Sequence, residues 1–376
     1  RMECSGKFQN DGTTDWDGMM VCGEIAINGG SDNDDGATII VNGAVADSGI
    51  DIGDNNFVGD ATTNVMINTA AVDYNWNSSA DYLGNLIVAN SGGGTFTATS
   101  ASNRCGNLTV ATGAILDGAA RTLTVAGDFT TSGGLIGKSA VTFDGTGDYV
   151  TVADNSDLEV GTNFTAEVWY KSTSDPDNYD RIIQKGTHGA REWAITFDTG
   201  GEVGGWINNG SSLIAVGNNT VASNDNKWHH VALVKSGNDL SFYLDGKLDD
   251  TATFSGSPVT SGSALLLGAE YNTSSSSYAY TFTGSIGRAS VWNEALTQAK
   301  IRAMMFQDWT TMAADATHTD GNAKMWLEFN EGTGSTVADS SAESNTGTLT
   351  NAVWAGAGTF TYGTSTLTMT GTSKNM

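Results

Sequence analysis

Two adjacent histidines beside a tryptophan are the first residues in this sequence whose types suggest chemistry. Trp228, His229 and His230 stand together, and imidazole is both a common metal ligand and a common general base. Residues 228–235 alternate with a period of two, which predicts a β-strand. Because successive side chains on a strand point to opposite faces, the two histidines cannot bind one metal ion together. We predict a scaffold role, with one histidine hydrogen-bonded in the core and the other at the surface.

The element expected to hold these residues is a β-hairpin. Turn-forming residues 236–239 separate the first strand from a second alternating run at 240–244. Asp245 and Gly246 then form a tight-turn signal, so a third strand is expected after Lys247.

Paired carboxylates, which glycoside hydrolysis requires, are not suggested by the spacing of the acidic residues. A retaining glycosidase needs two carboxylates about 5–5.5 Å apart. Glu192, Glu202 and Glu270 are isolated in the sequence, and Asp144 and Asp148 are assigned to a turn. The four scattered histidines suggest no Ser-His-Asp or Cys-His arrangement. We predict no catalytic residues and no enzymatic activity.

The composition predicts an all-β protein with many turns. The chain has 376 residues, with 48 glycines and only 2 prolines, and Ser, Thr, Asn and Asp are frequent throughout. No apolar run approaches the roughly 18 residues of a membrane-spanning helix. A formal net charge of −25 disfavours nucleic acid as a partner, because phosphate binding needs a basic surface. The acidic excess is compatible with a solvated surface or with divalent cations.

The three cysteines, Cys4, Cys22 and Cys105, all lie in the first part of the chain. A Cys4–Cys22 disulfide is one option, the odd count leaves one thiol over, and no spacing suggests zinc. The sequence begins with Arg and without a signal segment, which we interpret as a fragment of a longer protein or a processed chain.

Short alternating strands recur weakly through residues 1–138. The segments TIIVNG and TLTVAG begin at Thr38 and Thr122, and GNLIVA and GNLTVA begin 22 residues apart at Gly84 and Gly106. Such layers cannot bury their own apolar faces and must stack on neighbours, which predicts a β-solenoid-like stalk region. The alternative is an ordinary sandwich with irregular turns.

The pattern changes at Ser139. Alternating segments now follow at intervals of about 8–15 residues, which is typical of a sandwich of two antiparallel sheets. Near the end of this region Asn293 is expected to cap a short helix, with Leu296, Ile301 and Met305 on its apolar side.

An ordered set of segments in residues 139–308 carries a family resemblance: VTFDGTGDYVTV, FTAEVWYK, KWHHVALV, LSFYLDGK and GSIGRASVWNEALTQAKI. This region resembles a laminin-G-like domain of the concanavalin A-like lectin/glucanase superfamily. The resemblance implies a jelly-roll β-sandwich and places Trp228 and His230 in its packed framework. The acid-x-acid-x-x-acid run of the glucanase branch has no counterpart in this sequence.

One family segment is displaced. MWLEFNEGTGSTVADSSAESNTGTLTNAVW usually precedes the first strand of such domains, but here it begins at Met325. It either opens a second, truncated unit or closes the first sandwich in permuted order; we favour closure, by residues 309–362. Residues 363–376 contain TLTMTG and are expected to start a further β repeat. The lectin-like domain is then inserted in, or mounted on, a longer β-rich fibre.

A similarity to the pentraxin branch suggests a calcium site. There a Gly-x-Glu-x-Asp run supplies ligands, which implies the Glu270 carboxylate, the Tyr271 carbonyl and, as a weaker neutral ligand, Asn272. Arg191 and Glu192 stand where that branch has an Asp-Asn pair, and the arginine argues against the same site. The alternative is an ordinary strand that ends in a polar loop.

Residues 271–280 are the candidate sugar-binding loop, because lectin sites of this group lie in rim loops. Tyr271, Tyr278 and Tyr280 can stack on a sugar face and still form hydrogen bonds, and Asn272 with four consecutive serines supplies polar contacts. The alternative is a solvated connection.

Two tryptophans near this region are assigned to the scaffold instead of the sugar site. Trp193 and Trp206 are expected in the core.

We interpret the protein as a non-catalytic adhesion or recognition protein that carries a lectin-like, glycan-binding module. The expected setting is extracellular or on a virion surface, as in a phage fibre, another appendage or a bacterial adhesin, within a larger assembly or homo-oligomer. The alternatives are a purely structural filament protein, with the sandwich as decoration or assembly contact, and a glycoside hydrolase, which the sequence disfavours.

Overall fold

The computed structural model describes the backbone of residues 2–10, 19–27, 32–34, 38–41, 50–52, 57–68, 75–76, 83–89, 95–98, 102–111, 114–117, 122–133, 139–173, 179–217, 223–314, 320–355, 359–361 and 366–369. The chain divides into two compact units. Residues 1–138 and 356–376 form the parallel unit, and residues 139–355 form the sandwich unit.

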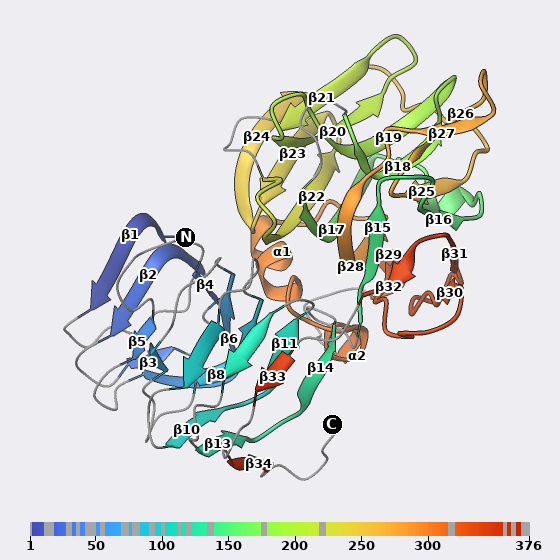
Figure 1. Ribbon diagram of the computed structural model, residues 1–376. Coiled ribbons are helices and arrows are strands. Elements are labelled where there is room, and N and C mark those ends of the chain that lie inside the picture. The colour runs from blue at the N-terminus through green and yellow to red at the C-terminus, as the bar shows by residue number, and fades with distance from the viewer. Residues whose placement is uncertain are drawn as a thin grey trace. The chain divides into compact units, whose positions relative to one another are not determined.

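The described residues of the parallel unit form three parallel sheets (Figure 1). The largest has the order β1 (Met2–Asn10), β2 (Met19–Ile27), β4 (Thr38–Val41), β6 (Phe57–Ile67), β8 (Leu83–Val88), β11 (Leu108–Ala111), β14 (Phe129–Gly133), with β3 (Asp32–Asp34) beside β6 and β5 (Ile50–Ile52) beside β2. The others run β10 (Ser102–Cys105), β13 (Thr122–Val125), β34 (Thr366–Met369) and β33 (Thr359–Thr361), β12 (Ile115–Asp117), β9 (Thr95–Ala98), β7 (Asn75–Trp76).

Hydrogen bonds accepted by asparagine side chains link residues on, or just before, successive strands of the largest sheet. Asn85 Nδ2 donates to Asn64 Oδ1 at 3.2 Å, and the backbone N–H of Asn107 donates to Asn85 Oδ1 at 3.2 Å. The N–H of Asp128 donates to Asn107 Oδ1 at 2.8 Å. Parallel in-register pairing is what stacked layers require, but the segments that would close each coil lie outside the described residues. The solenoid therefore stays a prediction.

The cysteines are only partly described. Cys4 and Cys22 are register partners across β1 and β2, but their side chains lie outside the described part of the chain. Cys105 is free and fully buried, and burial raises the pKa of its thiol. This cysteine is therefore an inert core residue.

The chain leaves the parallel unit after β14 and returns to it at β33. β33 pairs in parallel with β12, and β34 pairs in parallel with β13. The TLTM segment of β34 thus lies beside the similar TLTV segment of β13.

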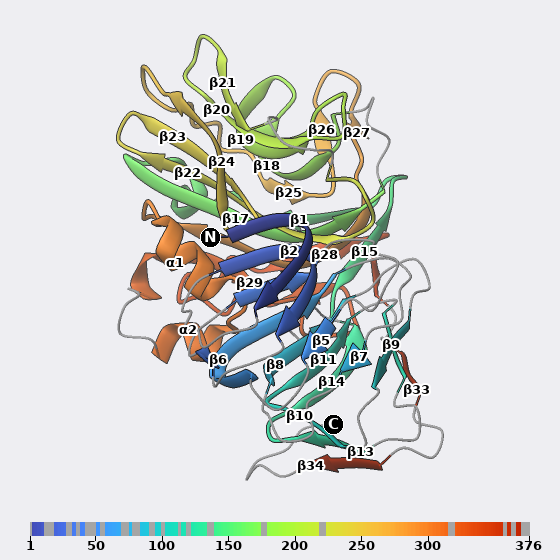
Figure 2. The same cartoon turned by 90° about the vertical axis from the view of Figure 1, so that its left-hand side faces the viewer.

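The described residues of the sandwich unit form two large antiparallel sheets and a separate two-stranded sheet of β26 (Glu270–Asn272) and β27 (Ser277–Ala279) (Figures 1 and 2). The β17 sheet has the order β24 (Lys247–Thr253), β23 (Asp239–Leu244), β22 (Trp228–Ser236), β17 (Asn163–Ser172), β28 (Thr283–Trp292), β15 (Val141–Asp144), β32 (Val353–Trp354), with β29 (Ala323–Leu327) also paired to β28. The β18 sheet has the order β21 (Leu213–Gly217), β20 (Val203–Asn208), β19 (Ala190–Phe197), β18 (Arg181–Thr187), β25 (Leu265–Leu267), β16 (Tyr149–Val152), β31 (Gly347–Thr350), β30 (Thr336–Val337). This arrangement confirms the predicted all-β jelly-roll sandwich.

Period-two alternation decides which side chains enter the core between the sheets. Val150 and Val152 of β16 and Leu265 and Leu267 of β25 point inward and are fully buried. Trp193 lies in the same core, as predicted. Trp206 is also buried, but the alternation places it on the outer face of the β18 sheet, where the Arg181 guanidinium lies 6.0 Å from its ring centroid.

The segment displaced in the sequence adds strands to both sheets. β29 pairs with β28 and β32 with β15 in one sheet, while β31 pairs with β16 in the other. The backbone N–H of Ala355 donates to the carbonyl of Ala140 at 2.8 Å, so the two ends of the unit are adjacent.

Helices α1 (Gln298–Met304) and α2 (Trp309–Ala314) and two 3₁₀ turns (Ser156–Leu158, Asp320–Asn322) complete the unit. The N-cap of α1 is Thr297, whose hydroxyl accepts from the Lys300 N–H, so the expected cap at Asn293 was wrong. Leu296, Ile301 and Met305 are buried, as the apolar pattern predicted. Among the described residues, no helix is both long and apolar enough to span a membrane.

The two histidines that suggested chemistry are both buried. His230 is fully buried on the outer face of the β17 sheet, and Trp228 is buried as well. The prediction of one surface histidine was wrong, because His229 lies between two carboxylates. Its Nδ1 is 3.0 Å from Asp245 Oδ2 and its Nε2 is 3.1 Å from Asp225 Oδ1. Burial opposes the charged form of this imidazole, but the aspartates at its two ring nitrogens stabilise that form and raise the pKa of His229 overall.

Candidate functional site

A pocket lies on the outer face of the β18 sheet, which is the face turned away from the core. Thr151 and Leu266 are register partners on β16 and β25, and each lies between two residues that point into the core. Both side chains therefore reach the outer face. The hairpin of β26 (Glu270–Asn272) and β27 (Ser277–Ala279) adds the aromatic part of the lining.

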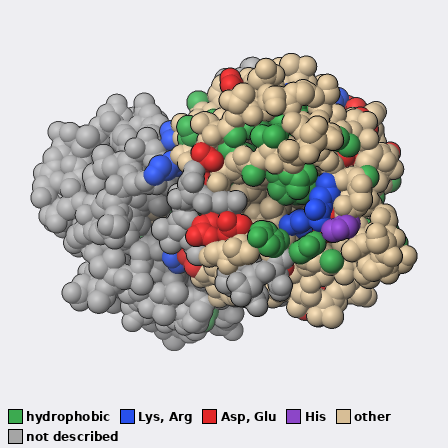
Figure 3. Space-filling view, turned by 90° about the horizontal axis from the view of Figure 1, so that it is seen from above, with side chains coloured by type: hydrophobic (Ala, Val, Ile, Leu, Met, Phe, Trp, Pro, Cys, Tyr) green, Lys and Arg blue, Asp and Glu red, His purple; other side chains and the backbone are tan. Residues whose placement is uncertain are grey.

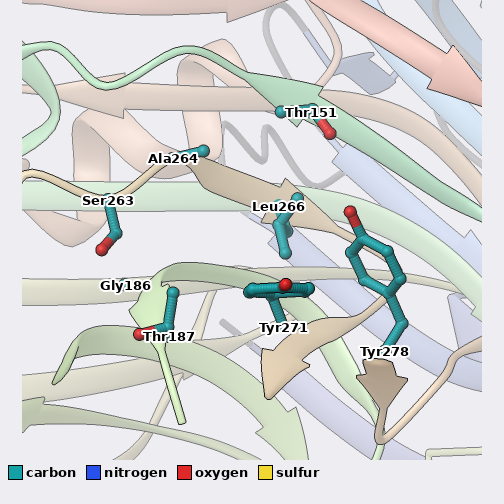
Figure 4. Close-up of a pocket in the computed structure, with 8 residues that line it drawn as sticks. All are labelled: Thr151, Gly186, Thr187, Ser263, Ala264, Leu266, Tyr271 and Tyr278. Carbon is teal, nitrogen blue, oxygen red and sulfur yellow. The ribbon is translucent and has the colours of Figure 1, made fainter. Parts of the chain in front are cut away.

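The pocket has a volume of about 270 Å³. Its lining residues are Thr151, Gly186, Thr187, Ser263, Ala264, Leu266, Tyr271 and Tyr278. Figure 4 shows the two tyrosine rings beside Leu266, with Ser263 and Thr187 at the other end. Typical small-molecule pockets begin at about 300 Å³, so this one suits a small ligand.

The tyrosines form a short aromatic row. The ring centroids of Tyr271 and Tyr278 are 5.2 Å apart, and Tyr278 stacks on Tyr149 with centroids 3.9 Å apart and an interplanar angle of 21°. Tyr278 remains 37% exposed. Burial and the hydrogen bond with Tyr149 raise the pKa of the Tyr278 phenol, so it stays neutral and can both donate and accept.

An ion pair anchors the base of the hairpin. The Glu270 carboxylate is fully buried, and Arg191 binds it through Nε and through Nη2, the latter at 2.7 Å from Oε2. Arg181 Nη2 lies 3.5 Å from the same oxygen. Burial alone would raise the pKa of Glu270, but the hydrogen bond from Arg191 and the two guanidinium charges lower it overall.

The residues expected to bind calcium do not fit that ion. The Glu270 carboxylate already takes a bidentate hydrogen bond from Arg191, whose positive charge would repel a cation. The Tyr271 carbonyl accepts from the N–H of His188 at 2.9 Å, and Asn272 Oδ1 accepts from the N–H of Ser274 at 3.0 Å. The described residues also contain no cluster of three or more potential metal-ligating side chains.

Only part of the predicted sugar-binding set comes together. Tyr271 and Tyr278 both line the pocket, as the aromatic loop suggested. Asn272 instead shapes the turn through Ser274 and Ser275. Tyr280 does not line the pocket, because its ring lies 4.6 Å below the Arg181 guanidinium.

A buried lysine holds the wall opposite the hairpin. Lys185 Nζ donates to the Ser263 carbonyl at 2.6 Å and to Asp154 Oδ1 at 2.6 Å. It also lies 3.3 Å from Glu192 Oε1, which accepts from the N–H of Ser261 at 2.8 Å. This network fixes the loop before β25, so Lys185 is a positioning residue for the pocket wall.

Sequence reasoning missed most of the lining. Thr151, Thr187, Ser263 and Leu266 are far apart in the chain, and only the strand order of the β18 sheet brings them together. The available signal was the alternation itself, which marks Thr151 in YVTV as an outward residue.

The rim of this face carries basic side chains. Arg191 Nη2 and His188 Nδ1 are 2.9 Å apart, and the His188 side chain is 40% exposed. In the view from above, a histidine and basic side chains lie next to hydrophobic ones (Figure 3). None of the residues that line the pocket carries a carboxylate. The nearby Glu192 and Glu270 are paired with Lys185 and Arg191.

Comparison with known families identifies this part of the chain. Residues 144–302 match a laminin G family model, described as the concanavalin A-like lectin/glucanases superfamily. Residues 144–302 are therefore similar to laminin-G-like domains of that superfamily, which confirms the resemblance seen in these segments.

Several solved structures are similar to this chain. One is described as a putative carbohydrate binding protein from Bacteroides ovatus, with 17% identity over 58% of this chain and 59% of that one, and a TM-score of 0.43. A heptameric SAP-like pentraxin from Limulus polyphemus has 18% identity over 45% of this chain and 81% of the pentraxin chain, with a TM-score of 0.36. Domains LG4-5 of the mouse laminin alpha1 chain have 17% identity over 44% of each chain, with a TM-score of 0.35.

Proposed function

We propose that the sandwich unit is a non-catalytic, lectin-like module and that the Tyr271–Tyr278 pocket binds a sugar. The observation that carries this proposal is the composition of the pocket: two tyrosine rings and Leu266 on one side, and the hydroxyls of Thr187 and Ser263 on another. Aromatic and hydroxyl groups are complementary to a pyranose, which has apolar C–H faces and an equatorial rim of hydroxyls.

The geometry favours one sugar unit over a long chain segment. A volume of about 270 Å³ is small for a binding pocket. Binding of a sugar ring against Tyr278 would require little movement of the protein, because the tyrosine ring is already held in place by its stack on Tyr149. Preorganisation of this kind lowers the entropic cost of binding.

The setting we infer is a surface-exposed adhesion protein, extracellular or on a virion. The support is topological: the module interrupts a unit of parallel strands, since the chain leaves after β14 and resumes pairing at β33. A module inserted in such a β-rich stalk would be displayed to cell-surface glycans. The stalk itself would belong to a larger assembly or homo-oligomer.

A glycan array tests the proposal. Wild-type protein is compared with Tyr278→Ala, which removes the exposed ring, and with Leu248→Ala, a control with an exposed apolar side chain on β24 of the other sheet. We expect defined glycans to bind wild type and Leu248→Ala but not Tyr278→Ala, with and without EDTA. Equal binding by all three proteins would place the site elsewhere.

The competing function is purely structural. In that case no glycan binds, and a particle-size measurement detects assembly that is insensitive to Tyr278→Ala. Hydrolysis of a bound glycan during the array incubation would instead support the disfavoured glycoside hydrolase.

A further inference from the structure

A second group of chemically active side chains is sealed beneath helix α1, on the outer face of the β17 sheet. His230, Trp169 and Arg288 are register partners on three adjacent strands, and Glu167 lies in the next row between Ala232 and Ser290. His230 and Glu167 are fully buried and Arg288 is 2% exposed. The pocket of the proposed sugar site lies on the other sheet, so this cluster has a separate role.

Glu167 and Arg288 each form hydrogen bonds through only part of their polar side chains. Glu167 Oε2 accepts from Ser290 Oγ at 3.0 Å and from Trp292 Nε1 at 3.2 Å. Arg288 Nη1 donates to the carbonyls of Met304 and Gln307, both at 2.9 Å, and so binds the end of α1.

The remaining polar atoms form no hydrogen bond with any described residue. They are Glu167 Oε1, both ring nitrogens of His230, Arg288 Nη2 and Gln307 Oε1. Glu167 Oε1 and His230 Nε2 are 3.6 Å apart, which is beyond a normal hydrogen bond. Buried polar atoms are almost always paired with protein or with ordered water, so a group of unpaired ones calls for a guest molecule.

The charges around the cluster decide the class of guest. A metal cation is disfavoured by the Arg288 guanidinium. An anion is disfavoured by the oxygens of Glu167, although burial raises the pKa of this side chain against the lowering effect of Arg288, Ser290 and Trp292. Burial and the charge of Arg288 lower the pKa of His230 well below its usual value, so the imidazole is neutral. A neutral imidazole has one donor and one acceptor nitrogen. The guest must therefore be neutral and must both donate and accept.

We propose that ordered internal water occupies this site and bridges Glu167 Oε1, His230 Nε2 and Arg288 Nη2. The water connects the β17 sheet to the segment after α1, because Arg288 also holds the Gln307 carbonyl. Water shared among a carboxylate, an imidazole and a guanidinium would make the docking of α1 dependent on a hydrated polar core. Apolar packing from Ile301 and Met304 then supplies the rest of the contact.

Crystal structures of the full chain test the site. Electron density for water within hydrogen-bond distance of Glu167 Oε1 and His230 Nε2 is expected in wild type and in Glu167→Gln, which keeps a polar oxygen. In Glu167→Met, which keeps the volume but not the oxygens, the density should be lost. No density in wild type, a direct Glu167–His230 hydrogen bond in its place, or density that persists in Glu167→Met would overturn the proposal.

A solution measurement decides the question if the variants fail to fold. In wild-type protein, cross-relaxation between water and the ring protons of His230 should be detectable by NMR. The indole N–H of Trp169 is the control, because it donates directly to the Met305 carbonyl at 2.6 Å and needs no water. Absence of the His230 signal, or an equal signal at Trp169, would contradict a specific water site.

Discussion

The ring of Tyr278 stacks on the ring of Tyr149, with centroids 3.9 Å apart and planes inclined by 21°. Tyr149 belongs to β16 of the β18 sheet, whereas Tyr278 belongs to the β26–β27 hairpin, which hydrogen-bonds as a separate two-stranded sheet. The stack therefore connects the β26–β27 hairpin to the β18 sheet, and both of these elements line the pocket.

Removal of this stack should loosen the hairpin without unfolding the domain. We expect Tyr149→Ala to speed amide hydrogen exchange in residues 270–280 by a few-fold to about tenfold, because an aromatic pair contributes about 0.5–1.5 kcal/mol. Tyr149→Phe keeps the ring and serves as the control. Unchanged exchange in the alanine variant would mean that the Glu270–Arg191 ion pair alone positions the hairpin.

Calcium should not stabilise the protein through the hairpin. Arg191 and the backbone of the turn already occupy the oxygens of Glu270 and Asn272. We expect no shift of the thermal midpoint when calcium is raised from micromolar to about ten millimolar, a range that covers extracellular calcium modules. A rise in wild type that is lost in Glu270→Gln would restore the calcium site.

The buried His229 should make the free energy of unfolding decrease as the pH becomes alkaline. Burial alone would lower its pKa, but Asp245 and Asp225 raise it from 6.5 to about 10. A group with a raised folded-state pKa contributes stability that is fully present below its unfolded pKa. That contribution should disappear as the pH rises from about 6.5 through 10.

Unfolding by denaturant at several pH values measures this effect. Wild type should lose stability over that range more steeply than His229→Gln. At neutral pH the variant should be less stable by about 3–5 kcal/mol, as when one partner of a buried ion pair is removed. Parallel pH profiles for the two proteins would show that the imidazole is neutral in the folded state.

The strands after residue 308 should be required for a stable sandwich. A protein of residues 139–355 should fold by itself, because its ends meet at the Ala355–Ala140 hydrogen bond. Residues 139–308 lack β29 to β32 and would expose edges of both sheets. We expect a much lower thermal midpoint for the shorter protein, and equal midpoints would show that β29 to β32 only decorate the sandwich.

The sequence by itself determined the local elements of the sandwich. Alternation in YVTV predicts a strand with Val150 and Val152 on one face and Thr151 on the other, because side-chain direction in a strand depends only on position. Trp193 was also expected in the core, where it lies, and the tyrosine loop gave two residues of the candidate site. These features depend on neighbours a few residues away.

Tertiary structure decided everything that depends on distant partners. His229 appeared suited to the surface until Asp245, on the turn after the next strand, supplied a buried counter-charge. Glu270 appeared suited to calcium until the order of strands placed Arg191 against it. A carboxylate or an imidazole has no fixed role of its own, because its charge state and contacts depend on which charges the fold brings within a few ångströms.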